Sequence, residues 1–160
     1  MREAAADAGD ARVGAVESPL APAWEERIGA TGATARGTDE PPIPHVVAWN
    51  LTRRCNLACA HCYISAGAWH AGAEELPTGR CLAIVDQLLE VNPALLLILS
   101  GGEPLVRTDL ETIAAHAARG GATVVVGSNG TGLTDDRIAS LQEAGVQGVA
   151  LSVDSLDPRY

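Results

Sequence analysis

Three closely spaced cysteines are the residues of this chain best suited to carry chemistry. Cys55, Cys59 and Cys62 stand in the run NLTRRCNLACAHCY, which begins at Asn50 and follows a short apolar segment. Clustered cysteines are common metal ligands, and structural zinc sites and electron-transfer clusters usually have four protein ligands. A trio therefore indicates a metal centre with one position left for another ligand.

Glycine-rich or polar residues also follow each of three later strand-like segments. These residues are Gly101-Gly102-Glu103-Pro104 after 94–100, Ser128-Asn129-Gly130 after 123–127, and Ser152 and Asp154 at the end of 147–152. In parallel α/β folds, ligands bind at the carboxyl ends of strands, which meet at one edge of the sheet. The sequence thus predicts a single site built from four strand ends.

Strand-like and helix-like stretches alternate from residue 45 onward. The expected strands are 45–51, 94–100, 123–127 and 147–152. The expected helices are 78–90, capped by Thr78; a second that opens with the capping box Thr108 to Glu111 and ends near Gly120; and a third that begins after Thr134 and stops at Gly145. Strand–helix–strand units with short loops cross over right-handed, so the pattern predicts either a parallel sheet or part of a barrel.

The cysteine spacing and the Gly-Gly-Glu-Pro turn together resemble the radical S-adenosylmethionine (radical SAM) superfamily. The resemblance runs from about residue 44 to residue 160. The segments WNLTRRCNL, HCY, SGGEPL and SVDSLD look like the branch that modifies haem precursors, such as haem d1 and siroheme-derived tetrapyrroles, and related members modify ribosomal peptides. The resemblance implies an α/β fold, a partial (β/α)6 radical SAM barrel with about four β/α units of parallel strands.

The resemblance also implies the cofactors and their contacts. Cys55, Cys59 and Cys62 would each bind one iron of a [4Fe–4S] cluster, and S-adenosylmethionine would chelate the fourth. One electron from the cluster would cleave that cofactor to a 5′-deoxyadenosyl radical, which abstracts hydrogen from the substrate, so no side chain is assigned a catalytic role. The implied cofactor-binding residues are His61 at the adenine; Gly101, Gly102 and Glu103 at the methionine end; Ser128 and Asn129 at a polar portion; and Ser152 and Asp154 at the ribose.

Plainer interpretations stay open for several of these residues. The cysteine trio could form a zinc site completed by His61, His70 or Cys81, although such a site leaves the Gly-Gly-Glu-Pro turn unexplained. Cys81 stands beside Leu82 in a helix pattern and is expected in the core. The two glycine-containing segments could be ordinary turns, and Asp154 could merely cap one. The alternatives in function are a peptide-modifying maturase and a non-catalytic iron–sulfur or zinc-binding protein.

Composition predicts how the chain is divided into a leader and a core domain. Residues 1–43 are rich in Ala, Gly, Pro and acidic residues and predict a disordered leader that fits no export signal. Residues 44–160 form the predicted core, which is expected to be truncated at its C-terminal end because no helix follows the last strand. We therefore expect the chain to assemble a cluster yet turn over its substrate poorly.

Charge and apolar runs restrict the partners and the location. A net charge of −9 offers nucleic acid no broad basic surface, and the longest apolar run, 94–99, is far too short to span a membrane. Four cysteines without an export signal indicate a reducing, cytoplasmic environment. The expected partners are a small-molecule or peptide substrate and, from the resemblance, an electron donor such as a flavodoxin or ferredoxin.

Overall fold

The computed structural model describes residues 42–70, 75–155 and 157, and the fold is described for these residues. Most of the predicted leader, residues 1–41, lies outside this part of the chain. Its predicted disorder therefore stays a prediction.

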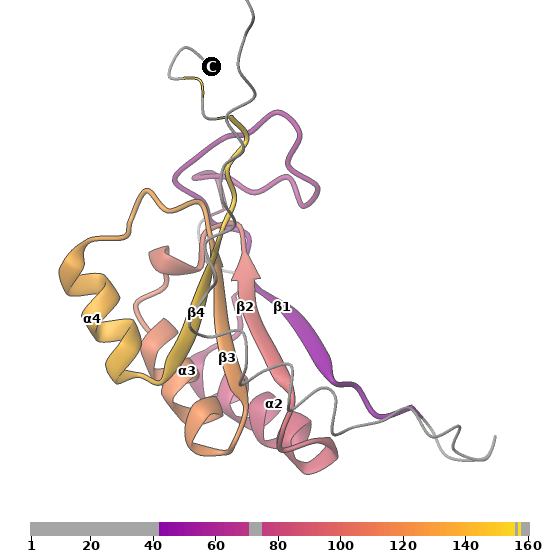
Figure 1. Ribbon diagram of the computed structural model, residues 1–160. Coiled ribbons are helices and arrows are strands. Elements are labelled where there is room, and N and C mark those ends of the chain that lie inside the picture. The colour runs from indigo at the N-terminus through magenta and orange to yellow at the C-terminus, as the bar shows by residue number, and fades with distance from the viewer. Residues whose placement is uncertain (1–41, 71–74, 156, 158–160) are drawn as a thin grey trace, which may run out of the picture. The chain divides into compact units, whose positions relative to one another are not determined.

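Four parallel strands form one sheet. They are β1 (Val46–Thr52), β2 (Leu96–Gly101), β3 (Thr123–Ser128) and β4 (Val146–Leu151), in the spatial order β1-β2-β3-β4 (Figure 1). Each predicted strand agrees with the observed one to within two residues at either end. The parallel α/β arrangement is confirmed and is consistent with part of a barrel.

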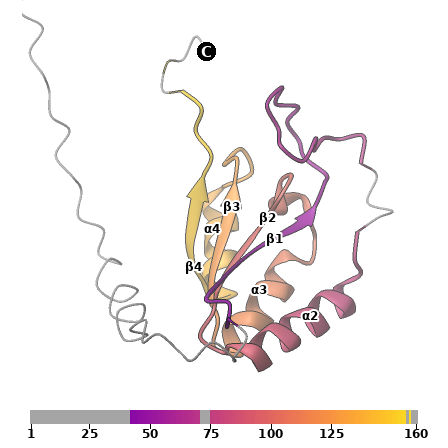
Figure 2. The ribbon, with the colours of Figure 1, turned by 90° about the vertical axis from the view of Figure 1, so that its right-hand side faces the viewer.

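Three α-helices and one short 3-10 helix connect the strands. The α-helices are α2 (Thr78–Val91), α3 (Leu110–Arg119) and α4 (Asp135–Glu143), and the 3-10 helix η1 covers Pro104–Val106. The α-helices lie against one face of the sheet (Figure 2), as right-handed crossovers between neighbouring strands require. Alternate strand residues on that face, such as Leu97, Leu99 and Val126, are fully buried in the core.

Two of the expected helix caps are wrong. Pro77 is the N-cap of α2, while the Thr78 hydroxyl donates instead to Asp109 Oδ2 at 2.7 Å. Helix α3 begins after Asp109 with no side-chain cap, so the predicted capping box from Thr108 does not form. The cause at Thr78 is the Asp109 carboxylate, which accepts hydrogen bonds from a buried arginine and from the Thr78 hydroxyl.

The third expected cap is confirmed. The Thr134 hydroxyl accepts the backbone N–H of Arg137 at 3.2 Å and starts α4, with Asp135 and Asp136 in the first turn. This helix ends before Gly145, whose φ of +81° is in the region that favours glycine. No helix in the described ranges has the length and apolar character needed to cross a membrane.

An irregularity in β1 marks the place where the chain leaves the sheet. Asn50 pairs with Ser100 and Thr52 with Gly101, so the register shifts around Leu51. Residues 53–70 then form an irregular loop beyond the carboxyl ends of the strands, drawn in purple in Figure 1. We call this segment the cysteine loop, because it contains Cys55, Cys59 and Cys62.

Candidate functional site

The predicted site residues lie together at the carboxyl edge of the sheet. The Asn129 side chain donates to Cys55 Sγ at 3.7 Å, and the Asn129 backbone N–H donates to Glu103 Oε2 at 2.8 Å. The Ser152 backbone N–H donates to the Ser128 carbonyl at 3.0 Å. The strand ends that the sequence predicted to converge are therefore in direct contact.

Two of the cysteine sulfurs already accept backbone N–H groups within their own loop. Leu57 N donates to Cys55 Sγ at 3.4 Å, and Ala66 N donates to Cys62 Sγ at 3.3 Å. At Cys62, the backbone N–H groups of Ala66 and Ile64 lower the pKa of the thiol and so favour the thiolate. Cys59 is exposed, whereas Cys55 and Cys62 are half-buried.

The donor set fits an iron–sulfur cluster in its chemistry. Three cysteines on one loop, two of them accepting N–H bonds at sulfur, provide the ligands and the hydrogen bonds that such clusters use. In residues 42–70, 75–155 and 157, no three His, Cys, Asp or Glu side chains converge on a point where one metal ion could bind. In a cluster, each cysteine binds a different iron, so its ligands need not converge in this way.

The two glycines of the turn are required by a close approach within the protein. A Cβ on Gly101, whose φ is +139°, would lie 2.4 Å from the Thr52 carbonyl oxygen. A Cβ on Gly102 would lie 2.3 Å from the Arg54 carbonyl oxygen. The same carbonyls accept the N–H groups of Gly102 at 2.8 Å and of Glu103 at 2.9 Å. The turn is therefore bonded to the start of the cysteine loop.

Glu103 is buried at the centre of the edge, with 1% of its surface exposed. Its Oε1 accepts from Leu105 N at 3.0 Å and from Ser128 Oγ at 2.9 Å, while Oε2 accepts from Asn129 N. All three donors are uncharged, and no cation of the described chain is within ion-pair distance. Each carboxylate oxygen can accept two bonds, so Oε2 retains one acceptor position.

Ser128 and Asn129 connect the end of β3 to its neighbours. Ser128 is buried, and its hydroxyl donates to Glu103 and accepts from Gly130 N at 2.9 Å. The Asn129 amide donates to Asn56 Oδ1 at 2.9 Å, and Asn56 in turn donates to Thr131 Oγ1 at 2.7 Å. Sequence reasoning missed Asn56 and Thr131, although Asn56 directly follows the first cysteine.

His61 and Asp154 form the outermost part of the site. Their Nε2 and Oδ1 atoms are 3.5 Å apart, and both side chains are more than half exposed. Ser152 and Asp154 lie just beyond β4, which ends at Leu151, and not on the strand itself. His61 from the cysteine loop and Asp154 from beyond the fourth strand thus face each other across the edge.

The other candidate ligands of a zinc site, Cys81 and His70, each contact a backbone carbonyl. Cys81 is buried in α2, where burial raises the pKa of its thiol, and Sγ contacts the Leu76 carbonyl at 3.7 Å. The His70 ring nitrogen Nε2 is 3.0 Å from the Ser65 carbonyl oxygen. The expectation of a core position for Cys81 is confirmed.

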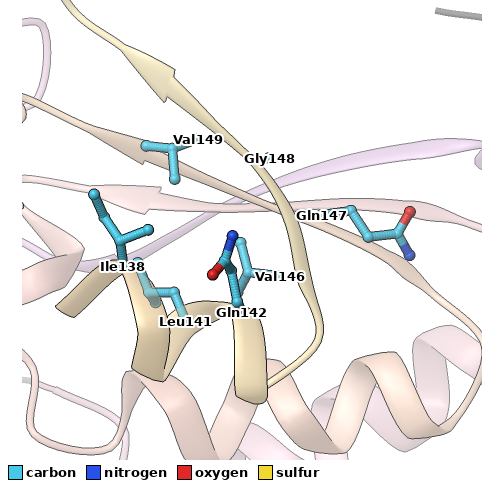
Figure 3. A pocket seen from close by; sticks show the side chains of 7 residues that line it. All are labelled: Ile138, Leu141, Gln142, Val146, Gln147, Gly148 and Val149. Carbon is cyan, nitrogen blue, oxygen red and sulfur yellow. The ribbon is translucent and has the colours of Figure 1, made fainter. Parts of the chain in front are cut away.

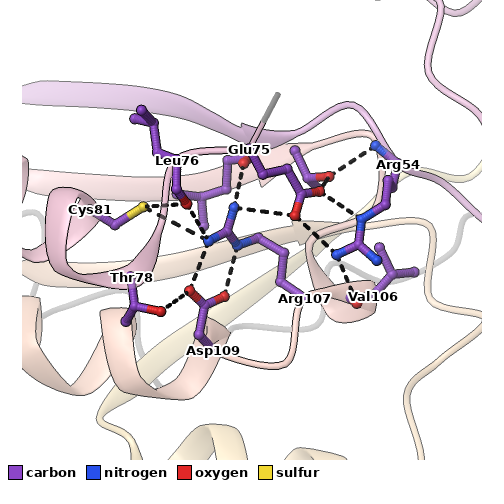
Figure 4. Close-up of polar contacts among 10 residues, drawn as sticks. Arg54, Glu75, Leu76, Thr78, Cys81, Val106, Arg107 and Asp109 are labelled. Carbon is purple, nitrogen blue, oxygen red and sulfur yellow. Dashed lines mark hydrogen bonds and ion pairs between the residues drawn. The ribbon is translucent and has the colours of Figure 1, made fainter. Parts of the chain in front are cut away.

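A polar network beneath the cysteine loop was not predicted from the sequence. Figure 4 shows Glu75 between the guanidinium groups of Arg54 and Arg107, with Asp109 on the other side of Arg107. Arg54 precedes the first cysteine and Arg107 follows the Gly-Gly-Glu-Pro turn by a few residues. Proximity to these motifs was the available signal, but nothing in the sequence shows that Arg107 is buried.

A shallow pocket of about 190 Å³ lies elsewhere, between α4 and β4 (Figure 3). Its lining includes Ile138, Leu141 and Val149 and none of the predicted site residues. Val149 and the neighbouring Leu151 are exposed along β4. The pocket is thus an apolar hollow at one margin of the sheet, separate from the site.

Several known proteins are similar to this chain in sequence. AdoMet-dependent heme synthase of Methanosarcina barkeri is 40% identical over 111 residues, which are 69% of this chain and 31% of that protein. Pre-heme d1 synthase of Dinoroseobacter shibae is 40% identical over 124 residues, 76% of this chain and 29% of that protein. Mycofactocin maturase MftC of Mycolicibacterium smegmatis is 34% identical over 119 residues, with shares of 74% and 29%. The chain spans less than a third of the length of these relatives.

A solved structure supports the fold. BtrN, crystallised in complex with AdoMet and 2-DOIA, has a TM-score of 0.58 and 20% sequence identity, covering 70% of this chain and 46% of BtrN. At that identity, the likeness concerns the fold alone. The family model described as the radical SAM superfamily matches residues 49–160. With the cysteine loop, the Gly-Gly-Glu-Pro turn and the parallel sheet in place, this match shows that the chain belongs to the radical SAM superfamily.

Proposed function

We propose that this chain supplies the cluster-binding and cofactor-binding part of a radical SAM enzyme that acts on a tetrapyrrole haem precursor. The observation that carries the proposal is the contact between Asn129 and Cys55, because it joins the cysteine loop to the end of β3 beside Glu103. One site therefore combines thiol ligands with polar groups from other strands.

The cysteine side chains are proposed to hold a [4Fe–4S] cluster. When bound, this cluster supplies one electron to cleave S-adenosylmethionine and so starts hydrogen abstraction from a substrate. The backbone N–H group of Ala66 at Cys62 favours the thiolate form, which is the form that binds iron, and the Leu57 N–H group orients the Cys55 sulfur. The exposed position of Cys59 leaves its sulfur free to reach a metal.

The remaining residues are proposed to bind and orient S-adenosylmethionine. Glu103 is proposed to accept from the cofactor's ammonium group, since a buried carboxylate without a cationic partner among the described residues gains from one. Gly101 and Gly102 lie beside Glu103, and Ser128 and Asn129 lie at the adjoining end of β3. His61, Ser152 and Asp154 are proposed to contact the adenine and ribose, because their exposed side chains lie at the outer edge.

The proposed substrate class is supported by relatives that share 40% identity and are named for haem synthesis. A peptide substrate is the second candidate, because the motifs also resemble peptide-modifying members of the superfamily and mycofactocin maturase MftC is 34% identical. An electron donor such as a flavodoxin or ferredoxin is proposed as the further partner, and the cytoplasm as the location.

Anaerobic reconstitution of the full chain with iron and sulfide tests the cofactor assignment. We expect about four irons per chain, as a [4Fe–4S] cluster contains, and a changed electron paramagnetic resonance signal of the reduced cluster when S-adenosylmethionine is added. A cluster whose signal ignores S-adenosylmethionine would favour an electron-transfer protein. Stoichiometric zinc in anaerobically purified protein, without iron or sulfide, would end the proposal.

A second measurement separates the substrate classes. The reduced chain is incubated with S-adenosylmethionine and either a siroheme-derived tetrapyrrole or a peptide. Because poor turnover is expected, the small amount of 5′-deoxyadenosine formed is quantified against a reaction without substrate. Greater product formation with the tetrapyrrole supports the proposal. Greater formation with the peptide alone would favour a maturase.

A further inference from the structure

Arg54 connects the cysteine loop to the Gly-Gly-Glu-Pro turn. Its backbone carbonyl accepts the Glu103 N–H at 2.9 Å, and a Cβ on Gly102 would meet the same oxygen. The next residue is Cys55. Any rotation of the backbone at Arg54 would therefore move a proposed cluster ligand and a proposed cofactor contact together.

Glu75 holds the Arg54 side chain in a bidentate ion pair. Arg54 Nε donates to Glu75 Oε1 at 2.7 Å and Nη2 donates to Oε2 at 3.1 Å. The Thr52 hydroxyl also donates to Oε1, and it accepts the Arg54 N–H at 2.9 Å. The carboxylate thus contacts both residues whose carbonyls bond the turn, and bidentate pairing restricts its geometry.

Buried Arg107 forms a second ion pair with Glu75. Its side chain is 3% exposed, and Nη1 lies 3.7 Å from Glu75 Oε2 while donating to the Leu51 carbonyl at 2.9 Å. Its Nε and Nη2 donate to the two oxygens of Asp109 at 2.8 Å each. Two arginines and two carboxylates therefore form a charge-balanced network that reaches the carbonyl at the β1 irregularity (Figure 4).

We propose that Glu75 is a positioning residue, which sets the separation between the cysteine loop and the Gly-Gly-Glu-Pro turn by fixing Arg54 against Arg107. The proposal rests on the proposed function, since that separation matters only if the two segments hold parts of one bound group. Glu75 itself acts through Arg54 and Thr52 and is not proposed to touch the cluster or the cofactor.

The test measures amide hydrogen exchange in the metal-free full chain by nuclear magnetic resonance. In Glu75→Gln, we expect the Gly102 and Glu103 amides to exchange about tenfold faster, because a charge-assisted pair is lost. The Val124 and Val126 amides of β3 should keep their wild-type rates. Asp86→Asn is the matched control, since it removes a carboxylate from the surface pair with His116 and should change none of these rates.

A second variant distinguishes a loss of positioning from a folding defect. Arg54→Lys keeps the positive charge but loses the bidentate geometry, and it should also speed exchange at Gly102 and Glu103. Unchanged rates at both amides in both variants would overturn the proposal. Equal acceleration at the β3 amides would do so too, because Glu75 would then stabilise the whole domain.

A ligand measurement links this positioning role to the cofactor. In reconstituted Glu75→Gln, we expect iron content near that of the wild type but about tenfold weaker binding of S-adenosylmethionine, measured by titration of the paramagnetic signal. Unchanged affinity despite faster exchange would overturn the link. Failure of the wild type to bind S-adenosylmethionine would refute the proposed function instead, and the exchange result distinguishes these two failures.

Discussion

The cysteine loop and the turn at residues 101–107 meet at the same edge of the sheet but are stabilised in different ways. In the loop from Cys59 onward, Cys59 is exposed and Tyr63 is 80% exposed, and local turns such as Cys62 N to the Cys59 carbonyl shape the backbone. In the turn, Glu103 and Arg107 are buried and bond to segments far away in the sequence.

We call the turn and the buried ion pairs of Arg107 the framework, whereas the cysteine loop is a surface whose thiols are available to bind another group. The polar groups of the turn are held by partners within the protein, as buried polar groups require, and one acceptor position of Glu103 Oε2 remains. The loop instead carries thiols directed at no common protein partner, which is suitable for a group that binds later. The loop is therefore expected to depend on its metal for order and the turn to be formed without it.

Loss of one loop cysteine should have the largest effect. Cys59→Ala is expected to abolish the cluster, while the free energy of unfolding of the metal-free chain changes by less than about 0.5 kcal/mol because the side chain is exposed. Iron analysis and chemical denaturation measure the two effects. Full iron content in this variant would contradict the ligand assignment.

Cys81→Ala is the matched control for that variant. It should retain the iron but lower the free energy of unfolding by about 1–2 kcal/mol, since Cys81 is 1% exposed in the core. The two cysteines would then show opposite responses, one in metal content and the other in stability.

On the framework side, Arg107→Ala should destabilise the metal-free chain by about 3–5 kcal/mol, because it removes one partner of a buried ion pair. Urea denaturation measures the change. Arg119→Ala, at the exposed end of α3, should cost less than about 0.5 kcal/mol. Similar losses in the two variants would show that burial of Arg107 does not matter.

Glu103→Gln should have an intermediate effect. An amide N–H group would replace an acceptor oxygen and face either Leu105 N or Asn129 N, which already donate. We expect a loss of about 1–3 kcal/mol in the free energy of unfolding. Exposed Glu90→Gln is the control, and a neutral result at Glu103 would mean that the edge readily rearranges.

Acid should weaken the framework gradually. Hydrogen bonds from Arg107 lower the pKa of Asp109 below 3.8, and although burial opposes it, Arg54 and Thr52 lower the pKa of Glu75 below 4.5. The unfolded chain binds these two protons more tightly than the folded chain does. The stability that the two carboxylates contribute is therefore complete above pH 4.5 and is lost as the pH falls through their folded-state pKa values. The urea midpoint of the metal-free chain should fall accordingly.

Asp109→Asn checks the origin of that acid response. The variant should be less stable at neutral pH and lose less of its remaining stability on acidification, since one of the two carboxylates is gone. An acid response equal to that of the wild type would assign the effect to other groups.

Local sequence patterns predicted most of the fold. The aliphatic run before Gly101 and the valines at 124–126 form the expected strands, and Thr134 caps α4 as expected. The cap at Thr78 was wrong because its hydroxyl donates to Asp109, which pairs with buried Arg107, and the capping box expected at Thr108 does not form. Local propensity is thus overridden where a buried charge must be satisfied.

By itself, the sequence determined the residue types of the candidate site, their spacing and their placement after successive parallel strands, because these depend on local order along the chain. Only the tertiary structure decided that Glu103 bonds to β3, that Gly101 and Gly102 pack on the start of the cysteine loop, and that Glu75 joins two arginines. The physical reason is that these contacts join residues 20 or more positions apart, as from Arg54 to Glu75 (21 positions) and from Glu103 to Ser128 (25 positions). Burial and pairing between such distant residues leave no periodic signal in the chain.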